Sequence, residues 1–242
     1  ALLPLTLTRV AQPTTPDAPR LRPALALRRS PLAAAGVVVA ALSAASFRMV
    51  GPVYGQEVGL NTGQIAWFLG AFVLGGAVAQ YPVGWLADKF DRRWVLIWLS
   101  VAAILSATLT IAAQGSGTTG VMLCALIFGL TTFPIYSVAA AHAHDFAEAH
   151  ERVELSAALM FFFALGAIAA PIMASVLIDA YGPAALFVMI SVGHLVLVLF
   201  GLLRMRARPV PEDRTAYTYA PRTSFQIGRL TKYARVRGKR RD

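Results

Sequence analysis

The sequence has one cysteine, Cys124, and few charged residues. A single cysteine permits no disulfide within the chain, and because it lies in an apolar run we interpret it as a small packing residue. Only 14% of the 242 residues are Asp, Glu, Lys or Arg, whereas a soluble domain usually contains about 25%. The chain is also 57% hydrophobic. A chain this apolar cannot hide its hydrophobic residues in one ordinary core, so we expect lipid to surround much of it.

The sequence also lacks the common motifs of enzymes. It contains no phosphate-binding loop, dinucleotide fingerprint or metal-ligand cluster. His142 and His144 are two residues apart, whereas paired metal ligands on a helix need a spacing of three or four. Gly115-Ser116-Gly117 resembles part of a nucleophile motif but falls in a predicted loop, with no convincing histidine partner. We therefore predict no enzyme, metal or cofactor, and keep an intramembrane hydrolase as an alternative.

Six apolar runs dominate what the sequence does contain. A membrane-spanning helix needs roughly 20 mostly apolar residues, and the alternating ten-residue segments of a membrane β-barrel do not occur. We predict an all-α membrane protein with six transmembrane helices in a domain of residues 31–207. Residues 1–30 are interpreted as the end of a preceding span plus a cytoplasmic linker, and residues 208–242 as a basic, disordered cytoplasmic tail. The predicted spans are 31–55, 62–87, 94–113, 120–142, 155–178 and 184–203.

Basic residues gather in alternate connections between these spans. The predicted loops 56–61, 114–119 and 179–183 contain no Lys or Arg, whereas the turn after the second span contains three and the segment from Arg204 onward contains twelve. The positive-inside rule therefore places the basic loops and both ends of the chain in the cytoplasm, in a multi-pass protein of the cell (inner) membrane. We interpret the basic tail as cytoplasmic or headgroup-facing charge, with no nucleic-acid partner.

The turn between the second and third spans carries a family signature. Residues 84–93 resemble the loop motif Gly-x-x-x-Asp-Lys/Arg-x-Gly-Arg-Arg/Lys of the major facilitator superfamily. Asp91 stands where the family usually has Gly; that position suits a left-handed backbone, which Asp tolerates. The matching residues are Gly84, Asp88, Lys89, Arg92 and Arg93.

This resemblance implies a transporter built from two six-span halves joined by a long linker. The chain starts at Ala1 with an apolar segment that an Arg- and Pro-rich stretch follows, so it looks like the C-terminal half. The function implied is secondary active transport of a small solute by alternating access. The implied partners are that solute, membrane lipid, and an N-terminal six-span half or a second copy. The alternatives are a complete six-span protein and a non-transporting scaffold or remnant.

The resemblance also suggests roles for the charged turn. Gly84 and Asp88 are four residues apart and share a helix face. Family resemblance implies that Gly84, Asp88, Lys89, Arg92 and Arg93 form a latch for one conformation, with Asp88 at its centre. The alternative is that the turn only sets the topology.

Polar residues within the spans are candidates for a substrate or proton pathway. A charge at the bilayer centre costs about 2.5–3.5 kcal/mol on insertion scales, so Arg48 is expected to bind an anionic group, pair with a carboxylate or extend to the outer headgroups. Gln80 and Tyr136 either line the cavity or form interhelical hydrogen bonds. His142 and Asp145 either relay protons or lie solvated at a helix end. His194 is predicted to be a hydrogen-bonded packing residue.

Overall fold

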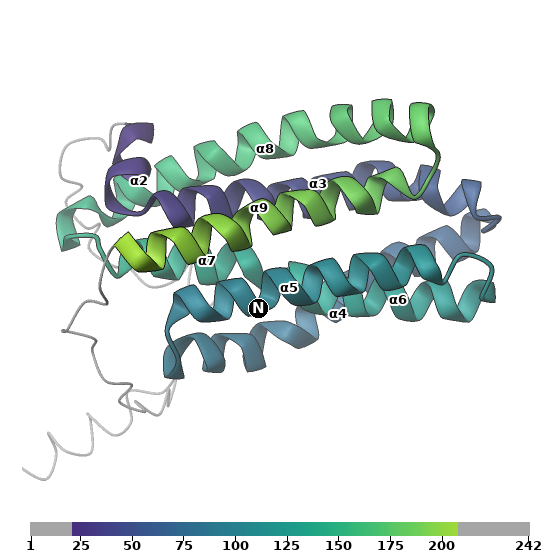
Figure 1. Ribbon diagram of the computed structural model, residues 1–242, viewed down its shortest axis with the longest axis horizontal. Coiled ribbons are helices and arrows are strands. Elements are labelled where there is room, and N and C mark those ends of the chain that lie inside the picture. Colours follow the sequence, from purple (N-terminus) through teal and green to yellow (C-terminus); the bar gives the residue numbers. More distant parts are fainter. Residues whose placement is uncertain (1–20, 208–242) are drawn as a thin grey trace, which may run out of the picture. The chain divides into compact units, whose positions relative to one another are not determined.

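The computed structural model describes residues 21–207, and every regular element in that range is a helix (Figure 1). Six candidate spans are long and apolar enough to cross a membrane, which confirms the predicted fold class. The predicted linker before residue 21 and the tail from residue 208 lie outside the described residues, so the division into three regions stays a prediction. The helices are α2 (Pro23–Arg29), α3 (Pro31–Glu57), α4 (Thr62–Lys89), α5 (Arg92–Ala112), α6 (Gly117–Thr132), α7 (Pro134–His144), η1 (Ala149–Glu151), α8 (Arg152–Tyr181) and α9 (Ala185–Ala207).

The fourth span is two helices, where the sequence predicted one. Helix α6 ends at Thr132 and α7 begins at Pro134, with Phe133 between them. Proline has no N–H for the bond to the carbonyl four residues earlier, but it fits the first turn of a new helix. By contrast, Pro82 and Pro171 lie inside the helices α4 and α8. The span therefore contains a joint at Phe133.

Small residues bring pairs of helices into backbone contact. A Cβ atom built on Gly75 of α4 would lie 2.0 Å from the carbonyl oxygen of Leu126 of α6, and one built on Gly129 of α6 would lie 2.0 Å from that of Phe72. A Cβ on Gly166 of α8 would lie 2.9 Å from the Val38 carbonyl oxygen of α3. Lipid gives no hydrophobic drive for helices to associate, so close packing of this kind holds them together. The second and fifth spans thus pack closely against the fourth and first spans, respectively.

Helix α3 packs along α7, α8 and α9, and it runs beside α8 and α9 in Figure 1. Its buried Phe47 belongs to an aromatic cluster contributed by four helices. The Phe47 ring is stacked on that of Phe72 with 4.2 Å between centroids, and it also contacts the rings of Phe128 and Phe187. These rings fill the interior where α3, α4, α6 and α9 meet.

Two of the turns between the spans have the local chemistry typical of helix ends. Asn61 caps α4 by accepting a hydrogen bond from the Gln64 amide at 2.9 Å, and the Gln64 side chain returns the contact to the Asn61 amide. Gly182 ends α8 with φ +83°, a left-handed value that glycine adopts without strain.

Candidate functional site

The turn that matched the loop signature connects α4 to α5. Asp91 precedes the first residue of α5 and accepts a hydrogen bond from the Arg93 amide at 2.9 Å. Its φ is −62° and its ψ is 118°, which is an extended conformation, so the prediction of a left-handed backbone at this position is wrong. Asp is favoured here because a helix N-cap requires an extended backbone and a side-chain acceptor. The Asp91 carboxylate also pairs with the Arg93 guanidinium at 2.9 Å, and the Arg93 side chain is 8% exposed.

Arg92 joins three helices at this end of the bundle. Its Nη2 donates to Asp88 Oδ1 of α4 at 3.2 Å, and its Nη1 donates both to the Ala141 carbonyl of α7 at 3.2 Å and to Asp145 Oδ1 at the end of α7. Both carboxylates are partly exposed, so each pair alone is worth little. A guanidinium shared by two carboxylates nevertheless fixes where α4 and α7 end relative to α5.

The other two residues of the signature face outward. A Cβ atom on Gly84 would meet no described atom within 4 Å, so no helix of the described chain approaches it. The Lys89 ammonium lies 4.9 Å from the ring centroid of Trp85. Gly84, Asp88 and Lys89 therefore form an exposed surface beside the Arg92 network.

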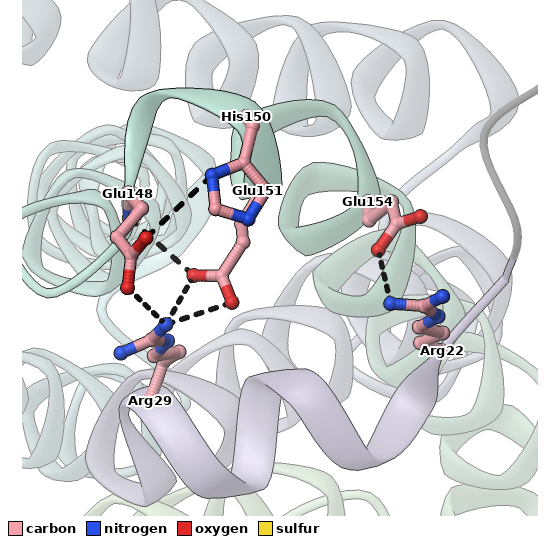
Figure 2. Close-up of polar contacts among 6 residues, drawn as sticks. All are labelled: Arg22, Arg29, Glu148, His150, Glu151 and Glu154. Atoms are coloured by element: carbon pink, nitrogen blue, oxygen red, sulfur yellow. Dashed lines mark hydrogen bonds and ion pairs between the residues drawn. The ribbon is translucent and has the colours of Figure 1, made fainter. Parts of the chain in front are cut away.

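The short helix α2 is tied to the start of α8 by ion pairs (Figure 2). Arg29 Nη2 contacts Glu151 at 2.7 Å and Glu148 at 3.0 Å, while Arg22 pairs with Glu154 at 3.2 Å. The hydrogen bonds to Glu151 and then Glu148 hold the pKa of Arg29 above its ordinary value. These contacts join α2 to the connection that leads into the fifth span.

Two of the proposed pathway residues lie around the Phe133 joint. The Arg48 guanidinium lies over the Phe133 ring, with Cζ 5.3 Å from the centroid. Arg48 is exposed, and none of the ion pairs within residues 21–207 includes it. On α4, Gln80 is also exposed, and its Oε1 accepts a hydrogen bond from Ser137 of α7 at 3.5 Å.

The other three proposed pathway residues lie in two different parts of the bundle, Tyr136 between α7 and α8 and the other two at the end of α7. The Tyr136 ring contacts Phe163 of α8 with 5.3 Å between centroids, so it links α7 to α8. His142 is buried near the end of α7 and contacts the Phe146 ring edge-on. Asp145 binds Arg92 and so belongs with the charged turn. The five residues thus do not form one continuous site.

Sequence reasoning missed several contacts that build this end of the molecule. The pairing of Arg92 with Asp145 and of Arg29 with Glu151 joins residues 53 and 122 positions apart. No local pattern indicates such pairs. The exposed hydroxyl of Ser137 was detectable in principle, because it lies one turn after Phe133 on the same helix as Tyr136.

Comparison with known proteins decides the family. A family model described as Major Facilitator Superfamily matches residues 33–237. The chain belongs to the major facilitator superfamily. Its membrane-spanning helices and its signature turn are therefore those of a superfamily member, and the predicted family is confirmed.

Two relatives illustrate how much of a superfamily member is present. An uncharacterized MFS-type transporter of Enterobacter sp. strain 638 is 28% identical over 213 residues, covering 87% of this chain and 54% of the relative. The uncharacterized MFS-type transporter YcaD of Escherichia coli O7:K1 is 29% identical with the same coverage. The chain spans about half the length of these curated relatives.

A solved structure supports the fold. The POT family transporter PepTSo, whose crystal structure was determined in meso, superimposes with a TM-score of 0.61 at 18% identity, covering 82% of this chain and 40% of that one. The described helices are thus arranged like part of that transporter. Together these findings show a multi-pass membrane protein of this superfamily, and the relatives and the structure that it resembles are named transporters and not enzymes, as the sequence predicted.

Proposed function

We propose that this chain is the C-terminal half of a secondary active transporter that moves a small solute by alternating access. The chain would act with an N-terminal six-span half, or with a second copy, around a shared central cavity. Its location would be the cell (inner) membrane, with the Arg92 end and both chain ends in the cytoplasm. The clustering of basic residues at that end supports this orientation.

The uneven burial of the spans supports a partner. In the most apolar window of α3, 61% of residues are buried, but the corresponding windows of α4 and α8 are only 33% and 22% buried. The exposed Gln80 of α4 and Ser137 of α7 lie beside each other, Tyr136 of α7 is partly exposed, and Arg48 of α3 lies over the Phe133 ring. Polar side chains in a span are costly against lipid, so this surface suits a solute cavity closed by the other half. Arg48 would bind an anionic group of the solute.

The shared guanidinium of Arg92 is the observation that carries the proposal. It holds α4, α5 and α7 together at the basic end through Asp88 and Asp145. If this network stabilises the conformation closed at that end, breaking it shifts the population toward the conformation open there. Gly84, Asp88, Lys89, Arg92 and Arg93 are thus proposed as the latch, and proton transfer by His142 or Asp145 stays a prediction.

Cysteine accessibility in the complete transporter tests this proposal. Cys124 is changed to Ser, and Ser137 on the proposed cavity surface is changed to Cys. Arg92→Gln is then expected to increase labelling by a membrane-impermeant maleimide added from the cytoplasmic side, and to lower the rate of solute uptake in a panel screen. Unchanged labelling together with parental uptake would overturn the latch. Labelling of Ser137→Cys that never differs between the two sides would indicate a scaffold instead of a transporter.

A further inference from the structure

An open pocket lies at the basic end of the bundle, where five helices begin or end. Three arginines line it: Arg29 from the end of α2, Arg93 from the start of α5 and Arg204 from the last turns of α9. His142 of α7 also lines the pocket. Arg93 and His142 also belong to the proposed latch and proton pathway, but neither of those roles uses Arg29 or Arg204.

The three cations differ in how far carboxylates neutralise them. Arg29 contacts Glu148 and Glu151, and Arg93 contacts Asp91. Within residues 21–207, no ion pair includes Arg204. Among the three arginines of this pocket, Arg204 is therefore the one whose positive charge no described carboxylate neutralises.

The N-terminus of α3 adds hydrogen-bond donors to the same pocket. Ser30 caps this 27-residue helix by accepting a hydrogen bond from the Ala33 amide at 3.2 Å, and both Ser30 and Leu32 line the pocket. The Leu32 amide is in the first turn, where amides have no acceptor within the helix. The positive end of the helix dipole therefore lies beside Arg204 and favours an anion.

We propose that this pocket binds a phosphate group, with Arg204 as its charge partner and the first turn of α3 as its donor of hydrogen bonds. The pocket lies where the spans α3, α5, α7 and α9 begin or end, which is the depth of the lipid headgroups. Basic pockets between spans suit anionic headgroups. The phosphate can thus come from an anionic phospholipid or from free phosphate, and the proposal does not depend on transport.

The test measures binding by the purified full chain in detergent. One arm follows retention of phosphatidylglycerol, with phosphatidylcholine for comparison, by native mass spectrometry. The other arm titrates inorganic phosphate by calorimetry. Arg204→Gln is expected to weaken binding about fivefold, the effect of one basic residue at an anionic headgroup, while Arg204→Lys keeps part of it. Arg206→Gln is the matched control, because Arg206 is exposed in the same last turn and does not line the pocket.

The pattern of results separates the two sources. Weaker phosphatidylglycerol retention alone assigns a lipid headgroup, weaker phosphate binding alone assigns the free anion, and a loss in both arms assigns a site open to either. Equal losses for Arg204→Gln and Arg206→Gln would show only general surface charge and overturn the proposal. If the Arg204→Gln variant does not fold, binding by the parental chain tests the proposal. The proposal fails if the parental chain binds neither phosphatidylglycerol nor inorganic phosphate saturably.

Discussion

The hydroxyl of Ser43 on α3 lies 2.9 Å from Nε2 of His194 on α9, and both residues are fully buried. The contact confirms that His194 is a hydrogen-bonded packing residue. It joins the first and last spans of the described chain without using the exposed surface. His194 therefore has a structural role that is separate from the proposed pathway.

Replacing Ser43 should weaken the pairing of α3 with α9. Ser43→Ala is expected to lower the free energy of unfolding by about 0.6–1.7 kcal/mol, the range for interhelical hydrogen bonds in membranes. Chemical unfolding in detergent measures this change. Thr108→Val is the control, because the exposed Thr108 hydroxyl bonds the Ile104 carbonyl of its own helix. A Ser43→Ala chain as stable as the parent would contradict the assigned role.

Adding a methyl group at the contact between α4 and α6 should separate the two helices. Gly75→Ala places a carbon against the Leu126 carbonyl oxygen, and overpacking of this kind typically costs about 1–3 kcal/mol. The thermal unfolding midpoint in detergent should fall. Gly70→Ala on the same helix should change little, because its Cβ meets no described atom within 4 Å. Equal midpoints for the two variants would refute the close contact.

The carboxylates that share Arg92 should act as a unit. Asp88→Asn and Asp145→Asn are each expected to increase cytoplasmic-side labelling of Ser137→Cys in the complete transporter. The double variant should show less than the sum, because both changes weaken the same guanidinium contact. Asp179→Asn is the control, since this exposed carboxylate pairs with no described cation. Strict additivity would mean that the two carboxylates act independently.

Arg48 should matter for uptake more than for folding. Arg48→Gln removes the only charge within α3 before its last residue and the contact with the Phe133 ring, a cation–π contact worth about 0.5–1 kcal/mol at exposed sites. We expect a strong loss of uptake at near-parental expression, and partial activity for Arg48→Lys. Parental uptake by Arg48→Gln would remove Arg48 from the proposed solute site.

The ion pairs of α2 should depend on salt and on acid. Glu151 and Glu148 hold the pKa of Arg29 above its ordinary value, so the guanidinium stays charged and its ion pairs persist at neutral and moderately alkaline pH. The hydrogen bond from Arg29 holds the pKa of Glu151 below its ordinary value, so the stability from this pair is lost only as the pH falls through that lowered pKa. Arg29→Gln should speed hydrogen exchange in α2 at low salt, whereas the exposed Arg28→Gln should not. Exchange that is the same in all three chains would show that these pairs do not hold α2.

The sequence predicted the spans well and the contacts between them poorly, for physical reasons. Twenty apolar residues in a row have one stable arrangement in a membrane, so the six spans followed from composition. Pro134 begins a new helix within its span, whereas Pro82 and Pro171 lie inside continuous helices. The neighbouring residues in the sequence do not indicate which proline ends a helix. The sequence also did not predict that Asp145 binds the guanidinium of Arg92, which lies 53 residues earlier in the chain. Such pairings depend on how the spans pack.

The backbone contact of α4 with α6 limits how the described bundle can change shape. With no side chain between the carbonyls and Gly75 or Gly129, sliding of one helix past the other would drive peptide groups into collision. The second span and the first part of the fourth are thus expected to travel together as one block. The Phe133 joint follows this block directly. We therefore expect α7, whose Ala141 carbonyl accepts a hydrogen bond from Arg92, to rotate relative to the block at this joint.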